Sequence, residues 1–413
     1  MLPRLAVALA LACAGLAAVP ANAASTSRSA SRQTTLADTS QPASNQRIKA
    51  AIHAYNGWLN QVKRRNDVVG LATAVVVDGH VRYERTMGYA DAATGAHVEP
   101  YTVFRLASLS KAFATAMTGL LVQRGRLSWN SRLKDILPFF QLKDIDDTRN
   151  ATVGDIAGQR IGLPRNSYDL RLEDHVPYTE LVRQLYRIKP ICNVGDCYSY
   201  QNVAFSMLGD VIHAKTGNFF DYEVGANLFH PLGMTTASYG RDGLEHSRSW
   251  AHPHRWSRHH WVPYEPKLDY YRVSPAAGVN ASIRDMEQWL IAQMGYRPDV
   301  LSPALLKTLH APGINTPSET WATPWRRARV HHAHYALGWR VYDYAGHTLI
   351  FHAGAVQGYR TEIAFLPDLH VGMIILWNCT DPVPGRLLPM FFDRVLGLPS
   401  VDWAHLDGKR LHH

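Results

Sequence analysis

Two side chains in the run Phe104-Arg-Leu-Ala-Ser-Leu-Ser-Lys-Ala-Phe113 could together make a nucleophile: Ser108 and Lys111. A serine hydroxyl attacks poorly at neutral pH unless an adjacent base takes its proton. A lysine that is desolvated among apolar neighbours can lose its own proton and serve as that base. Ser-x-x-Lys is also common by chance, and the alternative interpretation is a surface lysine one turn after a capping serine.

The residues that follow predict a helix starting at this serine. Apolar side chains recur at helical spacing until Gly125 supplies a stop signal; they are Leu109, Phe113, Met117, Leu120 and Leu121. Ser108 and Lys111 then share one face of the helix. The free N–H groups at the helix start would point toward a developing oxyanion.

Two further motifs lie far along the chain. Tyr200-Gln-Asn202 sits where a loop leads into an apolar helix, so its phenol and amide could stand at the mouth of a cleft. His352-Ala-Gly354 ends an alternating segment typical of a strand, where glycine allows another backbone or a ligand to approach closely. Taken singly, Tyr200 is a packed aromatic and His352 a strand residue. Their joint appearance with Ser-x-x-Lys favours a catalytic site.

These motifs resemble those of the serine β-lactamase and penicillin-binding-protein superfamily. The resemblance covers residues 47–398 and is to the class C β-lactamase-like branch, which also contains D-alanyl-D-alanine peptidases and esterases. Further features of that family are present: Gly162-Leu-Pro164, Pro275-Ala-Ala-Gly278 followed by Asp285, Tyr335-Ala-Leu-Gly-Trp339 and Gly354-Ala-Val-Gln-Gly358.

The resemblance implies a role for each motif residue. Ser108 is the expected acylated nucleophile, with Lys111 and Tyr200 as its coupled general acid and base. Asn202 is expected to orient Lys111 and to bind a substrate amide or carbonyl. The backbone N–H groups of Ser108 and Ala355 form the expected oxyanion hole, in which one lost donor costs about 3 kcal/mol of transition-state stabilisation.

The chain departs from the family pattern at two places. Many relatives carry Lys-Thr-Gly, which holds a substrate carboxylate, where this chain has His352, Ala353 and Gly354. An imidazole is mostly neutral at pH 7, so a fixed charge is missing and we expect weaker carboxylate recognition, with His352 and Gly354 still substrate-binding. His-x-Gly is frequent among the family's esterases and peptidases. The second departure, Gln159-Arg-Ile-Gly162 in place of His-Thr-Ser-Gly, changes one wall of the cleft.

The pattern of elements predicts an α/β (α+β) fold. Residues 70–77 and 80–89 flank Asp78-Gly79 and predict a hairpin. Strand-like alternation near the C-terminus must pair with that hairpin, and helices must cover the sheet; these segments are 338–344, 348–353, 359–366 and 371–378, with helices at 48–62 and 386–396. A mostly helical lobe, from Ser108 to about Leu301, is inserted between them. The resemblance makes this architecture β-lactamase/transpeptidase-like.

The N-terminus predicts export to the periplasm or the medium. Residues 1–23 combine a basic start, an apolar core and the cleavage site Ala21-Asn-Ala23, as in a signal peptide. Residues 24–46 are expected to be a flexible linker, 47–398 the hydrolase domain and 399–413 a tail. Cys13 offers an alternative as a lipid-attachment cysteine, although Ala10 replaces the usual leucine. No later stretch predicts a membrane span.

The remaining cysteines fit an oxidising compartment. Cys192 and Cys197 are expected to form a disulfide that closes a small loop before Tyr200 and contributes about 2 kcal/mol. Cys379 is then left over, as a small buried apolar residue.

Composition excludes some classes of function. The net charge of +9 is compatible with nucleic-acid binding, but export and the lack of such a motif argue against it. Histidines at 252–260 and 331–334 are expected in exposed loops near the cleft rim, and we predict neither metal nor cofactor. The partner is a small-molecule or peptide substrate, and the oligomeric state stays open.

Three functions remain as hypotheses: hydrolysis of a β-lactam or a D-amino-acid amide, hydrolysis of a carboxylic ester with the same residues, and a penicillin-binding sensor that acylates without turnover.

Overall fold

The computed structural model describes residues 40–408. The predicted signal peptide, Cys13 and residues 409–413 of the predicted tail lie outside the described residues.

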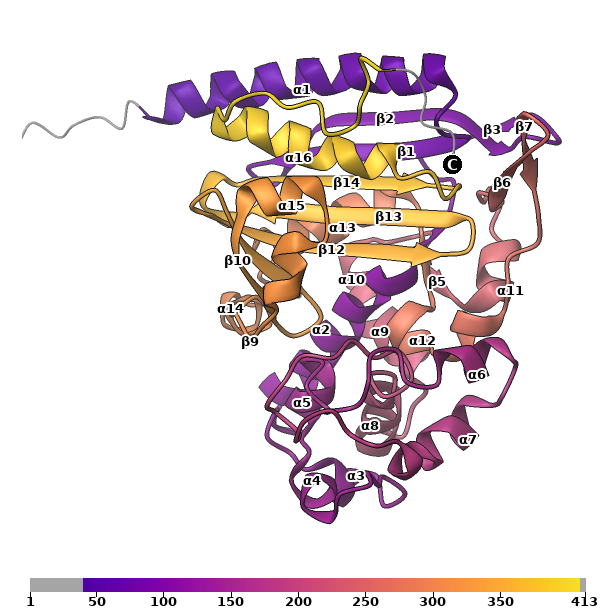
Figure 1. Ribbon diagram of the computed structural model, residues 1–413, viewed down its shortest axis with the longest axis vertical. Coiled ribbons are helices and arrows are strands. Elements are labelled where there is room, and N and C mark those ends of the chain that lie inside the picture. Colours follow the sequence, from indigo (N-terminus) through magenta and orange to yellow (C-terminus); the bar gives the residue numbers. More distant parts are fainter. Residues whose placement is uncertain (1–39, 409–413) are drawn as a thin grey trace, which may run out of the picture. The chain divides into compact units, whose positions relative to one another are not determined.

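An antiparallel nine-stranded sheet runs through the described part of the chain (Figure 1). Its order is β3-β2-β1-β14-β13-β12-β11-β10-β9, so the N-terminal hairpin joins the C-terminal strands through β1 and β14. The pairing of these two strands sets Leu71 opposite Trp377 and Val77 opposite Val371. The predicted sheet built from both ends of the chain is therefore confirmed. The strands are β1 (Gly70–Val77), β2 (His80–Asp91), β3 (Ala96–His97), β9 (Ile314–Asn315), β10 (Val330–Tyr335), β11 (Arg340–Tyr344), β12 (His347–Val356), β13 (Tyr359–Leu366) and β14 (Val371–Trp377).

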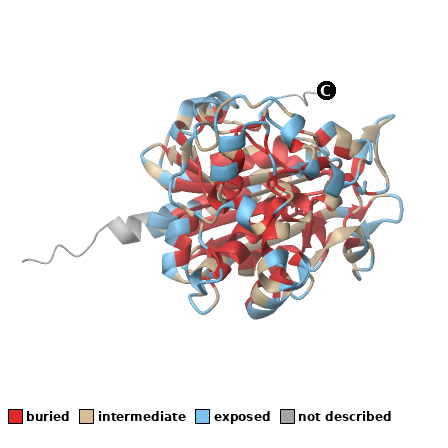
Figure 2. Cartoon of the chain, turned by 90° about the horizontal axis from the view of Figure 1, so that it is seen from below, coloured by how far each residue is buried: buried red, intermediate tan, exposed pale blue. Residues whose placement is uncertain are grey.

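Helices cover both faces of this sheet. On one face α1 (Ser40–Arg65) and α16 (Val383–Leu396) bury side chains such as Tyr55 and Phe391 against β1 and β14. On the other face lie α2 (Ser110–Gln123) and α13 (Ile283–Gln293). Every residue of β1 and β14 is buried, which explains why these strands are apolar apart from Thr73 instead of alternating. Figure 2 shows the buried residues gathered in the interior and the exposed ones on the periphery.

The segment between β2 and β9 is mostly helical, as predicted, and carries two small sheets. One small sheet has the order β4-β8-β5, and the other is the β6-β7 hairpin. Its remaining elements are β4 (Phe104–Arg105), β5 (Ser238–Tyr239), β6 (His254–Ser257), β7 (His260–Pro263), β8 (Val279–Ala281), α3 (Leu133–Ile136), α4 (Ile145–Asn150), α5 (Val153–Ala157), α6 (Asp169–Glu173), α7 (Tyr178–Arg183), α8 (Met207–Thr216), α9 (Phe220–Val224), α10 (His230–Leu232), α11 (Gly240–Glu245), α12 (Ser274–Ala277) and α14 (Pro303–Leu309), and α15 (Pro324–Arg329) follows β9.

Three local expectations were wrong. Helix α1 begins at Ser40, inside the stretch 24–46 predicted as a linker; Pro42 in its first turn is compatible with a helix start. Helix α2 begins at Ser110, and Ser108 lies in the preceding 3₁₀ turn η1 (Ala107–Leu109). The histidines at 331–334 lie on strand β10, and those at 254 and 260 on β6 and β7, because these segments pair with neighbouring strands.

Candidate active site

Ser108 stands on a tight turn between β4 and α2. Ala107, directly before it, has a φ of 51°, a left-handed conformation that non-glycine residues rarely adopt. The chain turns sharply at this residue. The Ser110 hydroxyl donates to the Ala107 carbonyl over 2.6 Å and accepts from the Val279 N–H over 2.9 Å. The turn is thereby anchored to β8, and Ser108 remains partly exposed to the cleft.

Lys111, three residues after Ser108, is completely buried. Its amine donates to the Asn202 Oδ1 over 2.7 Å and to the Ala276 carbonyl over 3.2 Å. Burial lowers the pKa of Lys111 to about 7; the Asp169 carboxylate opposes this shift, and the Arg340 guanidinium adds to it. Close to half of the Lys111 side chains are therefore uncharged at neutral pH, as a general base requires.

Tyr200 and Asn202 lie on the loop that leads to α8, and both line the cavity. The Lys111 nitrogen is 4.6 Å from the centre of the Tyr200 ring. Burial raises the pKa of Tyr200 to about 12, although a hydrogen bond with the Ser108 side chain lowers it. The phenol is therefore protonated at neutral pH and able to donate a proton.

Gln159 holds this loop in place from the segment where the chain departs from its relatives. Its side chain donates to the Gln201 carbonyl over 3.1 Å and accepts from the Gln201 N–H over 2.6 Å. Cys192 and Cys197 form the predicted disulfide, and this loop meets the same segment through the hydrogen bond from the Ile191 N–H to the Gly162 carbonyl. Gln159 thus fixes the backbone of the residue between Tyr200 and Asn202.

Backbone groups for an oxyanion meet where η1 touches β12. A Cβ atom on Gly354 would lie 3.2 Å from the Ser108 nitrogen, so the two backbones are adjacent. Strand β11 stops pairing with β12 at Phe351, and the turn before α2 packs against the later part of β12 instead. Ser108 and Ala355 line the same cavity. The oxyanion hole that their N–H groups would form stays a prediction.

His352 is buried and is absent from the cavity wall. Its Nδ1–H donates to the Ala353 carbonyl over 2.9 Å, which leaves Nε2 as an acceptor for the Tyr335 hydroxyl at 3.4 Å. Burial, followed by the charges of Arg340 and Lys111, lowers the pKa of His352 well below its ordinary value. The imidazole is therefore neutral, and its predicted contact with substrate stays a prediction.

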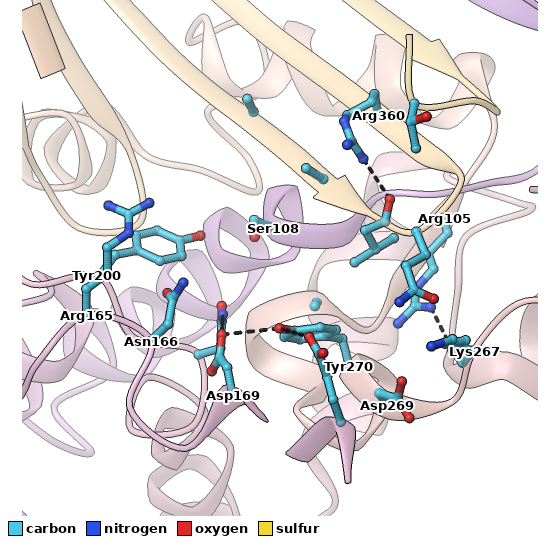
Figure 3. Close-up of a pocket in the computed structure, with 18 of the residues that line it drawn as sticks. Arg105, Ser108, Arg165, Asn166, Asp169, Tyr200, Lys267, Asp269, Tyr270 and Arg360 are labelled. Atoms are coloured by element: carbon cyan, nitrogen blue, oxygen red, sulfur yellow. Dashed lines mark hydrogen bonds between the residues drawn. The ribbon is translucent and has the colours of Figure 1, made fainter. Parts of the chain in front are cut away.

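A cavity of about 520 Å³ collects most of the predicted residues (Figure 3). Ser108, Tyr200, Asn202 and Ala355 line it, whereas Lys111, His352 and Gly354 lie behind its wall. Ala353 lines it as well, without the hydroxyl that a threonine would present there. In Figure 3, Ser108 lies between Tyr200 on one side of the cavity and Arg105 on the other.

The sequence interpretation missed several charged residues of this wall. Most are isolated in the sequence, and no motif marks them: Arg105, Arg165, Asp169, Glu173, Lys267, Asp269, Arg340 and Arg360. One signal did exist, because Arg340 directly follows the family motif that ends at Trp339. The Arg340 guanidinium lies 5.9 Å from the Tyr200 ring centre and pairs with Glu319 over 2.9 Å.

The described residues bear on two other kinds of function, metal binding and membrane insertion. Within residues 40–408, His, Cys, Asp and Glu nowhere gather in a group of three that could hold a metal ion. Over the same range the structure has no helix that is both long and apolar enough to cross a membrane.

Known proteins with similar sequences point to one family. The family model described as Beta-lactamase matches residues 54–391. Unguisins hydrolase ungD′ of Aspergillus campestris (strain IBT 28561) is 27% identical over 336 residues, 78% of this chain and 60% of that protein. Protein flp of Staphylococcus aureus (strain COL) is 23% identical over 79% of this chain and 62% of its own length. The chain thus spans about three fifths of these curated relatives.

Solved structures with low sequence identity share the fold. The octameric penicillin-binding protein homologue from Pyrococcus abyssi superimposes with a TM-score of 0.72 at 19% identity, covering 84% of this chain and 78% of that one. The crystal structure of SurE gives a TM-score of 0.68 at 19% identity, with 90% and 78% covered. These likenesses support the fold, and the family model that matches residues 54–391 shows the family: the chain belongs to the beta-lactamase family.

Proposed function

We propose that this serine hydrolase is exported, is of the class C β-lactamase type, and forms an acyl-enzyme on Ser108 while cleaving an amide bond. The amide is a β-lactam or a peptide bond to a D-amino acid. The observation that carries this proposal is the hydrogen bonding of Lys111. A neutral amine has two N–H donors and one lone pair, and Asn202 and Ala276 accept both donors. The lone pair is left for the proton of the nucleophile.

The chemistry follows from these protonation states. Lys111 takes the Ser108 proton, directly or through the Tyr200 hydroxyl, as the serine oxygen bonds to the substrate carbonyl carbon. The oxyanion is stabilised by the Ser108 and Ala355 N–H groups. When the C–N bond breaks, Tyr200 gives its proton to the leaving nitrogen and regains one from the Lys111 ammonium. Water then attacks the serine ester, and its proton returns to Ser108 as the acid leaves.

The charges of the cavity wall support a polar, peptide-like substrate. Arg165 and Arg340 flank the Tyr200 ring at 5.7 and 5.9 Å from its centre, on the side where the leaving group is protonated. Asp169, Glu173 and Asp269 line the same cavity. A wall with charges of both signs complements amide and zwitterionic groups better than a short apolar acyl chain. One curated relative is itself named a hydrolase of unguisins.

A carboxylesterase with the same catalytic residues is the second candidate. Ala353 favours it, because the cavity wall has no hydroxyl at the position where relatives hold a carboxylate. A sensor that acylates without turnover would use the same chemistry but stop at the serine ester.

Export is part of the proposal. Its support is the Cys192–Cys197 disulfide, since such bonds persist in oxidising compartments. N-terminal sequencing of the protein recovered from the periplasm or medium should start at Ala24. Retention of the full N-terminus in the cytosol would refute export.

The test of the function is turnover of a chromogenic cephalosporin, combined with intact mass and with Ser108→Ala as control. Turnover over many equivalents, absent in the variant, is the result expected of a β-lactamase. One equivalent of product with a stable mass adduct would identify a slow peptidase or a sensor. If the cephalosporin does not react and short acyl esters are cleaved, the protein is an esterase and the proposed amide hydrolysis is wrong.

A further inference from the structure

A buried carboxylate, that of Asp169, is connected to Lys111 through the side chain of Asn202, and no sequence motif marks it. Asp169 is 5% exposed, and its Oδ2 accepts from the Asn202 Nδ2 over 2.7 Å. The Asn202 Oδ1 in turn accepts from the Lys111 amine over 2.7 Å. The second Asp169 oxygen, Oδ1, is buried without a hydrogen-bond partner. The carboxylate therefore reaches Lys111 through a single amide.

This contact decides which way the Asn202 amide faces. An ionised carboxylate only accepts hydrogen bonds, so Asp169 requires the NH₂ end of the amide. The carbonyl end is then left for Lys111. In the opposite orientation the NH₂ group would face the Lys111 amine and an oxygen would face the carboxylate, so at least one buried hydrogen bond would be lost.

The carboxylate also acts on Lys111 through its charge. Among the charged groups near the amine, Asp169 favours the ammonium form and Arg340 disfavours it. Tyr200 and His352 also face this region, as a protonated phenol and a neutral imidazole. Burial raises the pKa of Asp169 to about 6, and the hydrogen bond from Asn202, the charge of Lys111 and the hydrogen bond from Tyr270 oppose this rise.

Asp169 is tied to the cavity wall on its other side. The Tyr270 hydroxyl lies 3.3 Å from the Asp169 Oδ2 and 2.8 Å from the Glu173 Oε1. Tyr270, Asp169 and Glu173 all line the cavity (Figure 3). Hydrogen bonds through Asp169 and Asn202 thus connect Tyr270, on the cavity wall, to the Lys111 amine.

We propose that Asp169 is a positioning residue for the acylation of Ser108. Acting through Asn202, it orients the Lys111 amine and favours the ammonium form of that amine. This inference rests on the proposed function of Ser108 as the nucleophile.

The first test measures the pH dependence of Ser108 labelling by an alkyl fluorophosphonate, read by intact mass. Asp169→Asn removes the charge and keeps an acceptor for Asn202, so its acid limb should move to lower pH by about 1 unit, with the plateau rate little changed. Asp169→Ala also removes the acceptor, so its plateau should fall about 10-fold or more. A purely structural role would lower the plateau without moving the limb. An Asp169→Asn profile that superimposes on wild type overturns the proposal.

The matched control is Asp210→Asn. Asp210 also accepts from a tyrosine, Tyr178, at 2.5 Å, and it lies on α8 outside the cavity wall. Its profile should coincide with wild type. A limb that shifts equally in Asp210→Asn would mean that any lost carboxylate has this effect and would refute the specific role of Asp169.

A second measurement does not depend on the reaction. Lysine Cε resonances followed by NMR in ¹³C-labelled protein give the titration of Lys111, assigned by its loss in Lys111→Met. Its midpoint should fall in Asp169→Asn. If Ser108 is labelled but the Lys111 midpoint does not fall, the role of Asp169 is overturned and the proposed function stands. If the midpoint falls but Ser108 is never labelled, Ser108 is not the nucleophile, and the effect of Asp169 on Lys111 stands. Should Asp169→Asn not fold, Tyr270→Phe replaces it, with a smaller fall expected; no fall would overturn the proposal.

Discussion

Gly354 and the Leu106 carbonyl oxygen are in such close contact that a Cβ at position 354 would stand 2.2 Å from that oxygen. The same oxygen accepts from the Thr361 hydroxyl over 2.9 Å. Strands β12 and β13 therefore both contact Leu106, two positions before Ser108. Gly354 allows the sheet to approach the Ser108 turn this closely.

Gly354→Ala should separate the two halves of the oxyanion hole. Real side chains do not tolerate 2.2 Å, so η1 must move away from β12. We expect the acylation rate to fall about 100-fold, as when one oxyanion donor is lost. The measurement is the rate of Ser108 labelling, with Gly57→Ala as control, because a Cβ there meets nothing within 4 Å. Wild-type rates in Gly354→Ala would contradict the contact.

The acylation rate should rise with pH around a midpoint of about 7, because burial lowers the pKa of Lys111 to about 7 and only its uncharged form accepts a proton. Below that midpoint the ammonium predominates and the rate falls. No fall is expected up to about pH 9, because the pKa of Tyr200 is raised to about 12. Lys111→Arg, which stays charged, should be slow at every pH. A flat wild-type profile from about pH 5 to about pH 9 would exclude Lys111 as the base.

Gln159→Leu should weaken the catalytic loop more than the fold as a whole. The change keeps the volume of the side chain but leaves the buried Gln201 N–H and carbonyl without partners, at a cost of about 1 to 3 kcal/mol each. The loop can relieve this cost by moving Tyr200 and Asn202 out of position. We expect a kcat at least about 10-fold lower, with a smaller change in KM. Loss of stability with an unchanged kcat would show that Gln159 only supports the fold.

Glu287→Gln should stabilise the protein at alkaline pH. Burial raises the pKa of Glu287 from 4.5 to about 8, and the neighbouring Glu84 adds to the shift. Between these values the folded state binds more protons than the unfolded state, so stability is lost as pH rises toward 8. The amide avoids this loss, and we expect a gain of about 2 kcal/mol at pH 8 that disappears near pH 4.5.

Urea unfolding of wild type and Glu287→Gln at both pH values measures this difference. Glu265→Gln is the control, because that carboxylate is 75% exposed. A difference between wild type and Glu287→Gln that does not change with pH would show that the Glu287 carboxyl is not held in its protonated form.

Local patterns were sufficient to predict much of the fold and to select candidate catalytic residues, of which Ser108, Tyr200 and Asn202 line one cavity. The sequence pattern of residues 348–353 and 359–366 predicted β12 and β13, although burial alternates only over the first residues of β13. Strand β10 was not predicted, since its histidines resemble a loop sequence and its pairing partners are β9 and β11. The Cys192–Cys197 pair was predictable because its two residues are neighbours in the sequence as well as in space.

Residue types and short spacings were enough to indicate the family, the order of its motifs and the candidate nucleophile with its lysine. The burial of Lys111, the neutral state of His352 and the contact of Asp169 with Lys111 through Asn202 came only from the packed chain. Burial and charge pairing bring together residues from distant segments. The protonation state of the site is therefore a property of the packed chain, and no local pattern contains it.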